Sequence, residues 1–149
     1  MKGLVQRVSR AQVDVGGETI ARIDRGLLVF VAVVRGDGEP ELERMVRKVG
    51  GLRIFPDEQG RMNRSVKEIG GEILAVSQFT LAAELSRGYR PSFGPAEEPE
   101  QAEKMFDRFV AGLRGMDIPV FCGEFGADMQ VGLTNDGPVT IWLDYPPKK

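Results

Sequence analysis

The chain has 149 residues, of which 42% are hydrophobic and 28% charged, and its net charge is −2. These values are typical of one soluble domain, which would span residues 1–149. No segment approaches the ~18 uninterrupted apolar residues of a membrane span, and the charged N-terminus lacks a secretory signal, so we expect a cytoplasmic protein without a membrane partner. With 0 histidines and one cysteine, Cys122, the sequence excludes an intrachain disulfide, histidine-based catalytic pairs and the usual zinc sites, and we expect no metal and no cofactor.

The first third of the sequence predicts β-structure. Residues 4–8 are rich in apolar side chains, and Gly16-Gly17 supplies the backbone freedom of a tight turn before residues 18–23. This pattern predicts a hairpin. Residues 27–34 form a continuous apolar run between two glycines, which predicts a core strand buried on both faces.

The spacing of apolar side chains predicts two helices. Residues 42–49 carry leucine, methionine and valine at helical intervals after Pro40, and the glycine pair at 50–51 ends the pattern. Residues 102–113 carry an apolar stripe opposite a charged face. Both stripes therefore predict helices that pack on the sheet.

Short strands are predicted in the rest of the chain. The candidates are residues 52–55, 73–76, 120–122, 129–133 and 139–143. Turns are expected at residues 56–60 and 134–138, where glycine, proline, aspartate and asparagine gather. This order of elements predicts an α/β fold: a compact domain with a mixed, largely antiparallel and curved, barrel-like sheet covered by two main helices.

Basic side chains are concentrated in residues 44–67. The lysines and arginines of this segment are opposed only by Asp57 and Glu58. Such a concentration of positive charge can bind phosphate groups. A solvated helix face followed by a loop has the same composition, so the pattern alone leaves RNA binding open.

The polar segment Ser77-Gln78-Phe79-Thr80 follows the predicted strand at residues 73–76 directly. Strand ends commonly display functional groups. Two hydroxyls, an amide and consecutive backbone N–H groups can form an oxyanion hole. The alternative is an ordinary turn, because serine and threonine hydroxyls often bond to the local backbone.

A second candidate is the turn Asn135-Asp136-Gly137-Pro138. The peptide bond before a proline can be cis at a modest cost of about 0.5–1 kcal/mol, and the sequence does not choose the isomer. Glycine leaves its carbonyl oxygen unshielded, so a Gly-Pro turn can hold an ammonium group at fixed geometry. A simple loop is again the alternative.

Several segments together resemble the D-aminoacyl-tRNA deacylase family, in order and across nearly the whole chain. They are Val5-Gln6-Arg7-Val8, residues 52–55, residues 60–65, Ser77-Gln78-Phe79-Thr80-Leu81, Arg90-Pro91-Ser92-Phe93, residues 125–129 and Asn135-Asp136-Gly137-Pro138-Val139-Thr140. The resemblance implies a homodimer that hydrolyses the ester between a D-amino acid and the terminal adenosine of tRNA. Glycyl-tRNA is implied as an achiral substrate.

The resemblance also implies roles for individual residues. Ser77, Gln78, Phe79 and Thr80 would line the ester site, and Met129 would contribute to the same pocket. Gly137 and Pro138 would form a cis turn that enters the partner subunit's site, binds the substrate amino group and excludes an L side chain. Arg7 would lock this turn, with Asn135 as a further supporting residue.

The missing histidine fits such a mechanism. An aminoacyl ester is already activated, and the neighbouring ribose 2′-hydroxyl can assist the attack of water, so the protein needs mainly to position groups and to stabilise the oxyanion. We expect Thr80 to assist, because no base that would activate it as a nucleophile is evident. Two alternatives remain: a small-ester hydrolase with a Thr80 or Ser77 nucleophile, and a noncatalytic RNA-binding module of the same fold.

Overall fold

One long strand, β1 (Lys2–Val15), runs through the centre of the sheet. The computed structural model describes residues 1–147. The other elements are β2 (Glu18–Ile23), β3 (Gly26–Ala32), α1 (Glu39–Gly51), β4 (Phe55–Pro56), β5 (Met62–Arg64), β6 (Glu72–Ser77), the 3₁₀ helix η1 (Phe79–Ala82), α2 (Pro99–Arg114), β7 (Val120–Cys122) and β8 (Gln130–Asp144). None of the helices in residues 1–147 is long and apolar enough to cross a membrane.

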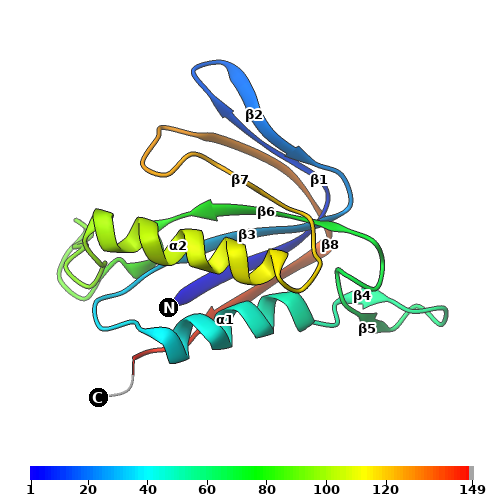
Figure 1. Cartoon of the computed structure of the whole chain (residues 1–149). Helices are drawn as coiled ribbons and strands as arrows, with labels where there is room; N and C mark the ends of the chain where they lie inside the picture. The colour runs from blue at the N-terminus through cyan, green and yellow to red at the C-terminus, as the bar shows by residue number, and fades with distance from the viewer. Residues whose placement is uncertain (148–149) are drawn as a thin grey trace.

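The main sheet is mixed and strongly curved. Its order is β2-β1-β3-β6-β7, and β8 pairs with the free edge of β1. The pairs among β1, β2, β3 and β8 are antiparallel, whereas β3, β6 and β7 run parallel. The outermost strands of this order, β2 and β7, contact each other, so the sheet is nearly closed. Helices α1 and α2 lie on one face of the sheet (Figure 1), which confirms the predicted α/β class.

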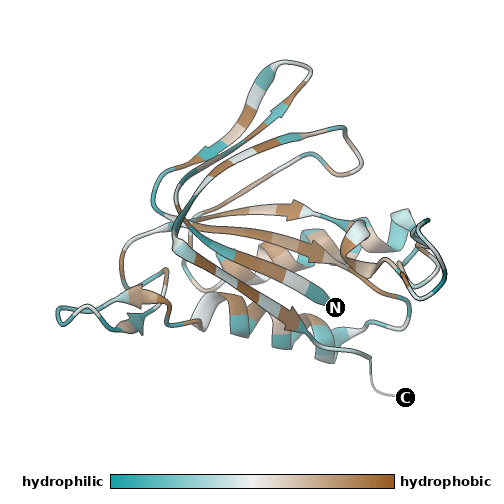
Figure 2. Cartoon of the chain, turned by 180° about the vertical axis from the view of Figure 1, so that it is seen from behind, coloured by the Kyte–Doolittle hydropathy of each residue, from teal (hydrophilic) through white to brown (hydrophobic). Residues whose placement is uncertain are grey.

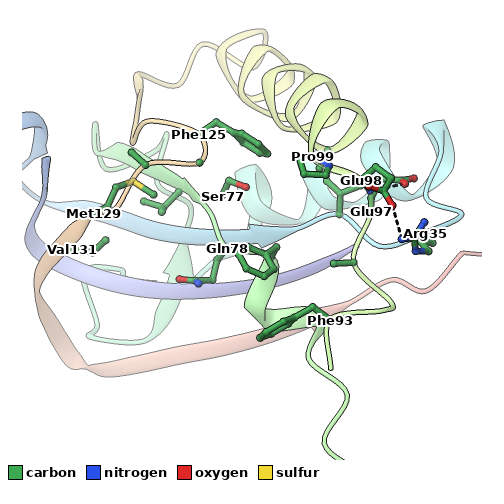
Figure 3. A pocket seen from close by; sticks show the side chains of 17 residues that line it. Arg35, Ser77, Gln78, Phe93, Glu97, Glu98, Pro99, Phe125, Met129 and Val131 are labelled. Atoms are coloured by element: carbon green, nitrogen blue, oxygen red, sulfur yellow. Dashed lines mark hydrogen bonds and ion pairs between the residues drawn. The ribbon is translucent and has the colours of Figure 1, made fainter. Parts of the chain in front are cut away.

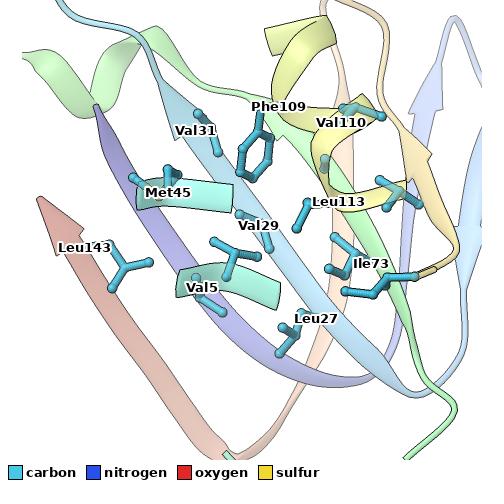
Figure 4. Packing of buried hydrophobic residues seen from close by; sticks show 14 of the residues in the cluster. Val5, Leu27, Val29, Val31, Met45, Ile73, Phe109, Val110, Leu113 and Leu143 are labelled. Carbon is cyan, nitrogen blue, oxygen red and sulfur yellow. The ribbon is translucent and has the colours of Figure 1, made fainter. Parts of the chain in front are cut away.

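The main core lies between the sheet and the two helices. Figure 4 shows its side chains meeting from both layers. The members at its centre are Val5, Leu27, Val29, Val31, Met45, Ile73, Phe109, Val110, Leu113 and Leu143. Residues 27–34 are buried almost throughout, as predicted for the core strand. Both predicted helices are confirmed, and each buries the apolar stripe that its sequence carries.

A second core fills the opposite, concave face of the sheet. Val8, Val13, Ile23, Leu28 and Val76 are buried there, each at most 1% exposed. Met129 and Val131 pack against this cluster. Since strand side chains alternate between faces, the curved sheet buries residues on both sides, and this second cluster borders the pocket described below.

The structure corrects three of the predicted elements. The strands expected at residues 129–133 and 139–143 are one strand, β8, that continues through the predicted turn. The strand expected at residues 52–55 is wrong except at Phe55, which begins the short β4. Neither β5 nor η1 was predicted from the sequence.

A large bulge in β8 takes the place of the predicted turn. Gln6 pairs with Thr140 and Val8 pairs with Asn135, so the four residues 136–139 of β8 lie opposite the single residue Arg7. Both halves of β8 therefore pair with the same strand, and the chain bends outward without reversing direction. This bend positions the Gly137-Pro138 pair.

Candidate active site

A pocket of about 510 Å³ opens beside the end of β6. Its wall includes Ser77 and Gln78 from the strand end, Phe79 from η1, and Met129. Figure 3 shows Ser77, Gln78 and Met129 together with Phe125 from the loop before β8. The structure thus brings together four of the residues predicted from the sequence: Ser77, Gln78, Phe79 and Met129.

The backbone at the pocket wall turns sharply after Ser77. The Gln78 N–H still donates to the Val31 carbonyl at 2.8 Å, which continues the pairing of β6 with β3. The chain then enters η1, and within residues 1–147 the N–H groups of Phe79 and Thr80 have no acceptor. Unpaired N–H groups are usual in the first turn of a helix. Here they are available to an oxygen of a bound ligand.

Thr80 lies just outside the pocket lining. Its hydroxyl accepts a hydrogen bond from the Gln78 side-chain amide at 2.5 Å. This bond fixes the Gln78 side chain at the pocket edge. With no histidine in the chain, imidazole cannot activate this hydroxyl as a nucleophile.

Two aromatic rings form the outer edge of the pocket. Phe79 and Phe93 meet edge to face, with ring centroids 5.0 Å apart and an interplanar angle of 73°. Phe79 nevertheless remains 54% exposed. Exposed aromatic faces can stack on the bases of nucleic acids. Phe93 and Phe125 were not predicted as site residues, although both belong to segments that carry the family resemblance.

A charged group closes the far end of the pocket. Arg35 pairs with Glu98 at 2.7 Å, and its Nε donates to the Gly94 carbonyl at 2.8 Å. Figure 3 shows this pair beside Glu97 and the first turn of α2. Arg35, Glu97 and Glu98 were not predicted from the sequence, because single charged residues in loops carry no distinctive signal.

The Gly137-Pro138 pair lies in the exposed bulge of β8, and its peptide bond is cis, as the resemblance implied. The Asn135 side chain spans the bulge: its Oδ1 accepts the Val139 N–H at 3.1 Å, and its Nδ2 donates to the Thr140 hydroxyl at 2.8 Å. These two bonds tie the start of the bulge to its end. Asn135 is therefore the side chain that braces the turn from within.

Arg7 braces the same turn from β1. Its Nε donates to the Asp136 carbonyl at 3.1 Å, and its Nη1 donates to the Ile54 carbonyl at 2.7 Å. The Asp136 carboxylate lies 3.5 Å from the same guanidinium. Because this planar group is 12% exposed, its donors are directed at fixed acceptors.

The turn and the pocket lie at opposite ends of the sheet. Across neighbouring strands Asn135 aligns with Val8, Val8 with Gly26, and Gly26 with Glu72, the first residue of β6. Ser77 ends that strand, about 16 Å further along at the usual rise per residue. No residue of the turn lines the pocket, so within one chain the two candidate segments do not meet.

Cys122 lies outside the pocket lining, in β7. Its burial raises the pKa of its thiol above the ordinary value, with Asp107 adding to the effect and Arg114 opposing it. A neutral thiol is a weak nucleophile.

Within residues 1–147, no group of three or more cysteine, aspartate and glutamate side chains is arranged to hold a metal ion.

Comparison with known proteins gives a consistent result over the full length. The family model described as D-Tyr-tRNA(Tyr) deacylase matches residues 4–144. A D-aminoacyl-tRNA deacylase of Magnetococcus marinus is 60% identical over 150 aligned positions, covering 100% of this chain and 99% of the relative. The D-aminoacyl-tRNA deacylase of Paracoccus denitrificans is 56% identical, covering 97% of each chain.

Solved structures share the same architecture. The c-Myc DNA Unwinding Element Binding Protein superposes with a TM-score of 0.93 at 47% identity, over 98% of this chain and 99% of that one. A probable eukaryotic D-amino acid tRNA deacylase has a TM-score of 0.80 at 19% identity, over 97% and 98% of the two chains, and shows the fold alone. On the family match and the full-length identities, the chain belongs to the D-Tyr-tRNA(Tyr) deacylase family.

Proposed function

We propose that this chain is an ester hydrolase that cleaves D-aminoacyl-tRNA, and also glycyl-tRNA, to free amino acid and tRNA in the cytoplasm. The observation that carries the proposal is the pocket beside β6: Phe79 lines it, Thr80 follows directly, and the backbone N–H groups of both residues have no acceptor within residues 1–147. Two such donors beside a pocket suit the oxyanion of an acyl transfer. The 60% identity to a D-aminoacyl-tRNA deacylase supports this choice of substrate.

The proposed mechanism depends on stabilising the negative charge that develops on the ester carbonyl oxygen. It uses no general base from the protein. Water attacks the ester carbonyl, and the N–H groups of Phe79 and Thr80 donate to the developing oxyanion. The ribose 2′-hydroxyl of the substrate assists the attacking water. The bond between the acyl carbon and the ribose oxygen then breaks; the amino acid keeps the hydroxyl of water, and the proton passes to the ribose oxygen.

The pocket edge suits the terminal adenosine of tRNA. The Phe79 ring is held by Phe93 in an edge-to-face contact but remains largely exposed. A base stacked on an aromatic ring gains about 1–3 kcal/mol. We therefore assign the Phe79 and Phe93 edge to the adenine and the interior, beside Ser77, to the ester.

Selectivity for the D-amino acid is proposed to come from the Gly137-Pro138 turn of a second subunit. The turn is exposed, braced by Asn135 and Arg7, and too far from its own pocket to act there. In the partner's pocket its carbonyl oxygens accept the ammonium group of the substrate. An L side chain would then collide with the turn, whereas a D side chain points away from it.

The sheet face opposite the helices supports a homodimer. Leu4 pairs with Phe30 on one side and with Trp142 on the other, so the three apolar side chains form a row across β3, β1 and β8. Gly3 faces Met45 of α1, and Leu4 therefore faces away from the helices. Neither α1 nor α2 covers this row (Figure 2), and Trp142 is 49% exposed, which suits contact with a second copy.

The first prediction concerns Thr80. We expect Thr80→Ala to slow single-turnover hydrolysis of D-tyrosyl-tRNA by at most about tenfold, the value of one neutral hydrogen bond. Thr80→Ser is the matched control, since it keeps the hydroxyl that Gln78 contacts. A loss of about 10⁴-fold or more with an acyl-enzyme trapped in mass spectrometry would instead show a covalent route. If the wild-type chain leaves the half-life of the ester unchanged, the noncatalytic RNA-binding alternative holds.

A further inference from the structure

A cationic groove lies along the second half of α1, away from the pocket. We call it the α1 groove; it has a volume of about 580 Å³. Its lining is Arg44, Arg47, Lys48, Gly51, Leu52, Arg53 and Tyr145. In the part of the chain that the structure describes, this lining contains four cationic side chains and no carboxylate. Positive charge is therefore concentrated here in a chain whose net charge is −2.

The cations of the α1 groove are largely available to a ligand. Arg47 makes one exposed contact with Glu43 at 3.8 Å, of a kind that contributes little stability. Within residues 1–147, Arg44, Lys48 and Arg53 have no carboxylate at ion-pair distance. The Arg44 guanidinium lies over the Tyr145 ring, 4.4 Å from its centroid, so its position is already ordered before any ligand binds.

The α1 groove is joined to the Gly137-Pro138 turn through Arg7. This guanidinium bonds to the carbonyl of Ile54, the residue after Arg53, and to the carbonyl of Asp136, the residue before Gly137. The groove and the turn are thus parts of one braced surface. The turn lies away from the chain's own pocket, because it aligns with the start of β6 and the pocket lies at the end of that strand, and no residue of the groove lines the pocket.

From this arrangement we infer that the α1 groove of one subunit binds the acceptor-stem phosphates of a tRNA whose 3′ end occupies the pocket of the other subunit. The inference rests on the proposed function, in which the Gly137-Pro138 turn acts in the partner's pocket. Because Arg7 connects the groove to that turn, the groove would lie beside the same pocket of the partner subunit. Phosphates are the ligands that a carboxylate-free cluster of arginine and lysine favours. Each tRNA would then contact both subunits.

The first test uses reversal of charge in the α1 groove. We expect Arg47→Glu with Lys48→Glu to raise KM for D-tyrosyl-tRNA by about tenfold or more, to leave kcat unchanged, and to lower the slope of log KM against log salt by about two. Both side chains are exposed on α1, so the fold should tolerate the change. The matched control is Lys104→Glu on α2, an exposed lysine outside the groove.

A second substrate separates this inference from the proposed function. D-Tyrosyl-adenosine has the ester and the adenosine but no acceptor-stem phosphates, so the groove variant should cleave it at the wild-type rate. If the wild-type chain hydrolyses neither substrate, the proposed function fails. If it hydrolyses both and the groove variant keeps the wild-type KM for tRNA, the inference alone is overturned. The inference is also overturned if the α1 groove binds duplex DNA while the groove variant keeps the wild-type KM for tRNA.

Mixed dimers test whether the groove acts across the subunits. One protomer carries Arg47→Glu and Lys48→Glu, and the other carries a pocket inactivated by Phe79→Pro, which removes the proposed oxyanion N–H and the exposed ring at the start of η1. In such a dimer the intact pocket faces the partner's intact groove, so we expect one site with wild-type KM for D-tyrosyl-tRNA. A KM as high as that of the groove variant alone would show that the groove serves its own subunit, and would overturn the inference.

Discussion

Replacing Gly137 by alanine is expected to slow hydrolysis of D-tyrosyl-tRNA by about 100-fold or more, the usual result of displacing a positioning group by about 1 Å. Gly137 has a φ of +126°, which alanine adopts only with strain of about 1–3 kcal/mol. A Cβ there would lie 2.9 Å from the Val139 side chain and 3.0 Å from Arg7 Nη2. The turn must therefore shift, and its carbonyl oxygens would no longer meet the substrate ammonium.

The control for this variant lies on the same strand. Gly132→Ala adds the same methyl group to β8, but its nearest neighbour is Gln12 Cγ at 3.7 Å, an ordinary contact. We expect this variant to keep the wild-type rate. The measurement is single-turnover hydrolysis at saturating enzyme, together with the thermal unfolding of each variant. A Gly137→Ala protein that folds and hydrolyses at the wild-type rate would exclude the turn from the site.

Removing the Arg7 side chain is expected to have the second largest effect. Arg7→Ala leaves the Asp136 and Ile54 carbonyls without their donor, which should destabilise the fold by about 1–3 kcal/mol. Because the turn then loses its support from β1, we also expect a fall in hydrolysis of about 100-fold. Arg7→Lys should recover little, since one ammonium group cannot reproduce the two directed contacts of the guanidinium.

Arg10 provides the comparison for Arg7. It also lies on β1 and contacts β8, where its Nε donates to the Thr134 hydroxyl at 3.2 Å, but it is exposed and does not contact the bulge. Arg10→Ala should therefore keep both the stability and the rate of the wild type. Chemical denaturation gives the free energy of unfolding, and single-turnover kinetics gives the rate. Equal behaviour of the two alanine variants would contradict a bracing role for Arg7.

The elements that the sequence predicted well are those whose signal is local. The apolar stripe of α2 and the apolar run that became β3 each describe the burial of a single element, so their spacing was sufficient. The predicted turn at residues 134–138 was wrong because asparagine, aspartate, glycine and proline favour a reversal and a bulge equally. The choice depends on the pairing of both halves of β8 with β1, which is a long-range contact.

The candidate site likewise combines residues that local sequence signals predict with residues that only long-range contacts bring together. Ser77 and Gln78 could be placed at a strand end from the sequence, and the structure puts them in the pocket wall. Arg35 reaches the pocket from a segment far along the chain from Phe93 and Glu98, and only the packing of the fold brings them together. The separation of Gly137 from its own pocket likewise follows from strand register, which composition does not encode.

The most direct test of the proposed function is a comparison of D-tyrosyl-tRNA with L-tyrosyl-tRNA as substrates of the wild-type chain. The two differ only in the configuration at one carbon atom, so a difference in their rates reports on how the site reads that configuration. We predict that the D-substrate is hydrolysed at least about 100-fold faster, as expected when a rigid site excludes one side chain. Equal rates of hydrolysis for the two substrates would contradict the proposed function.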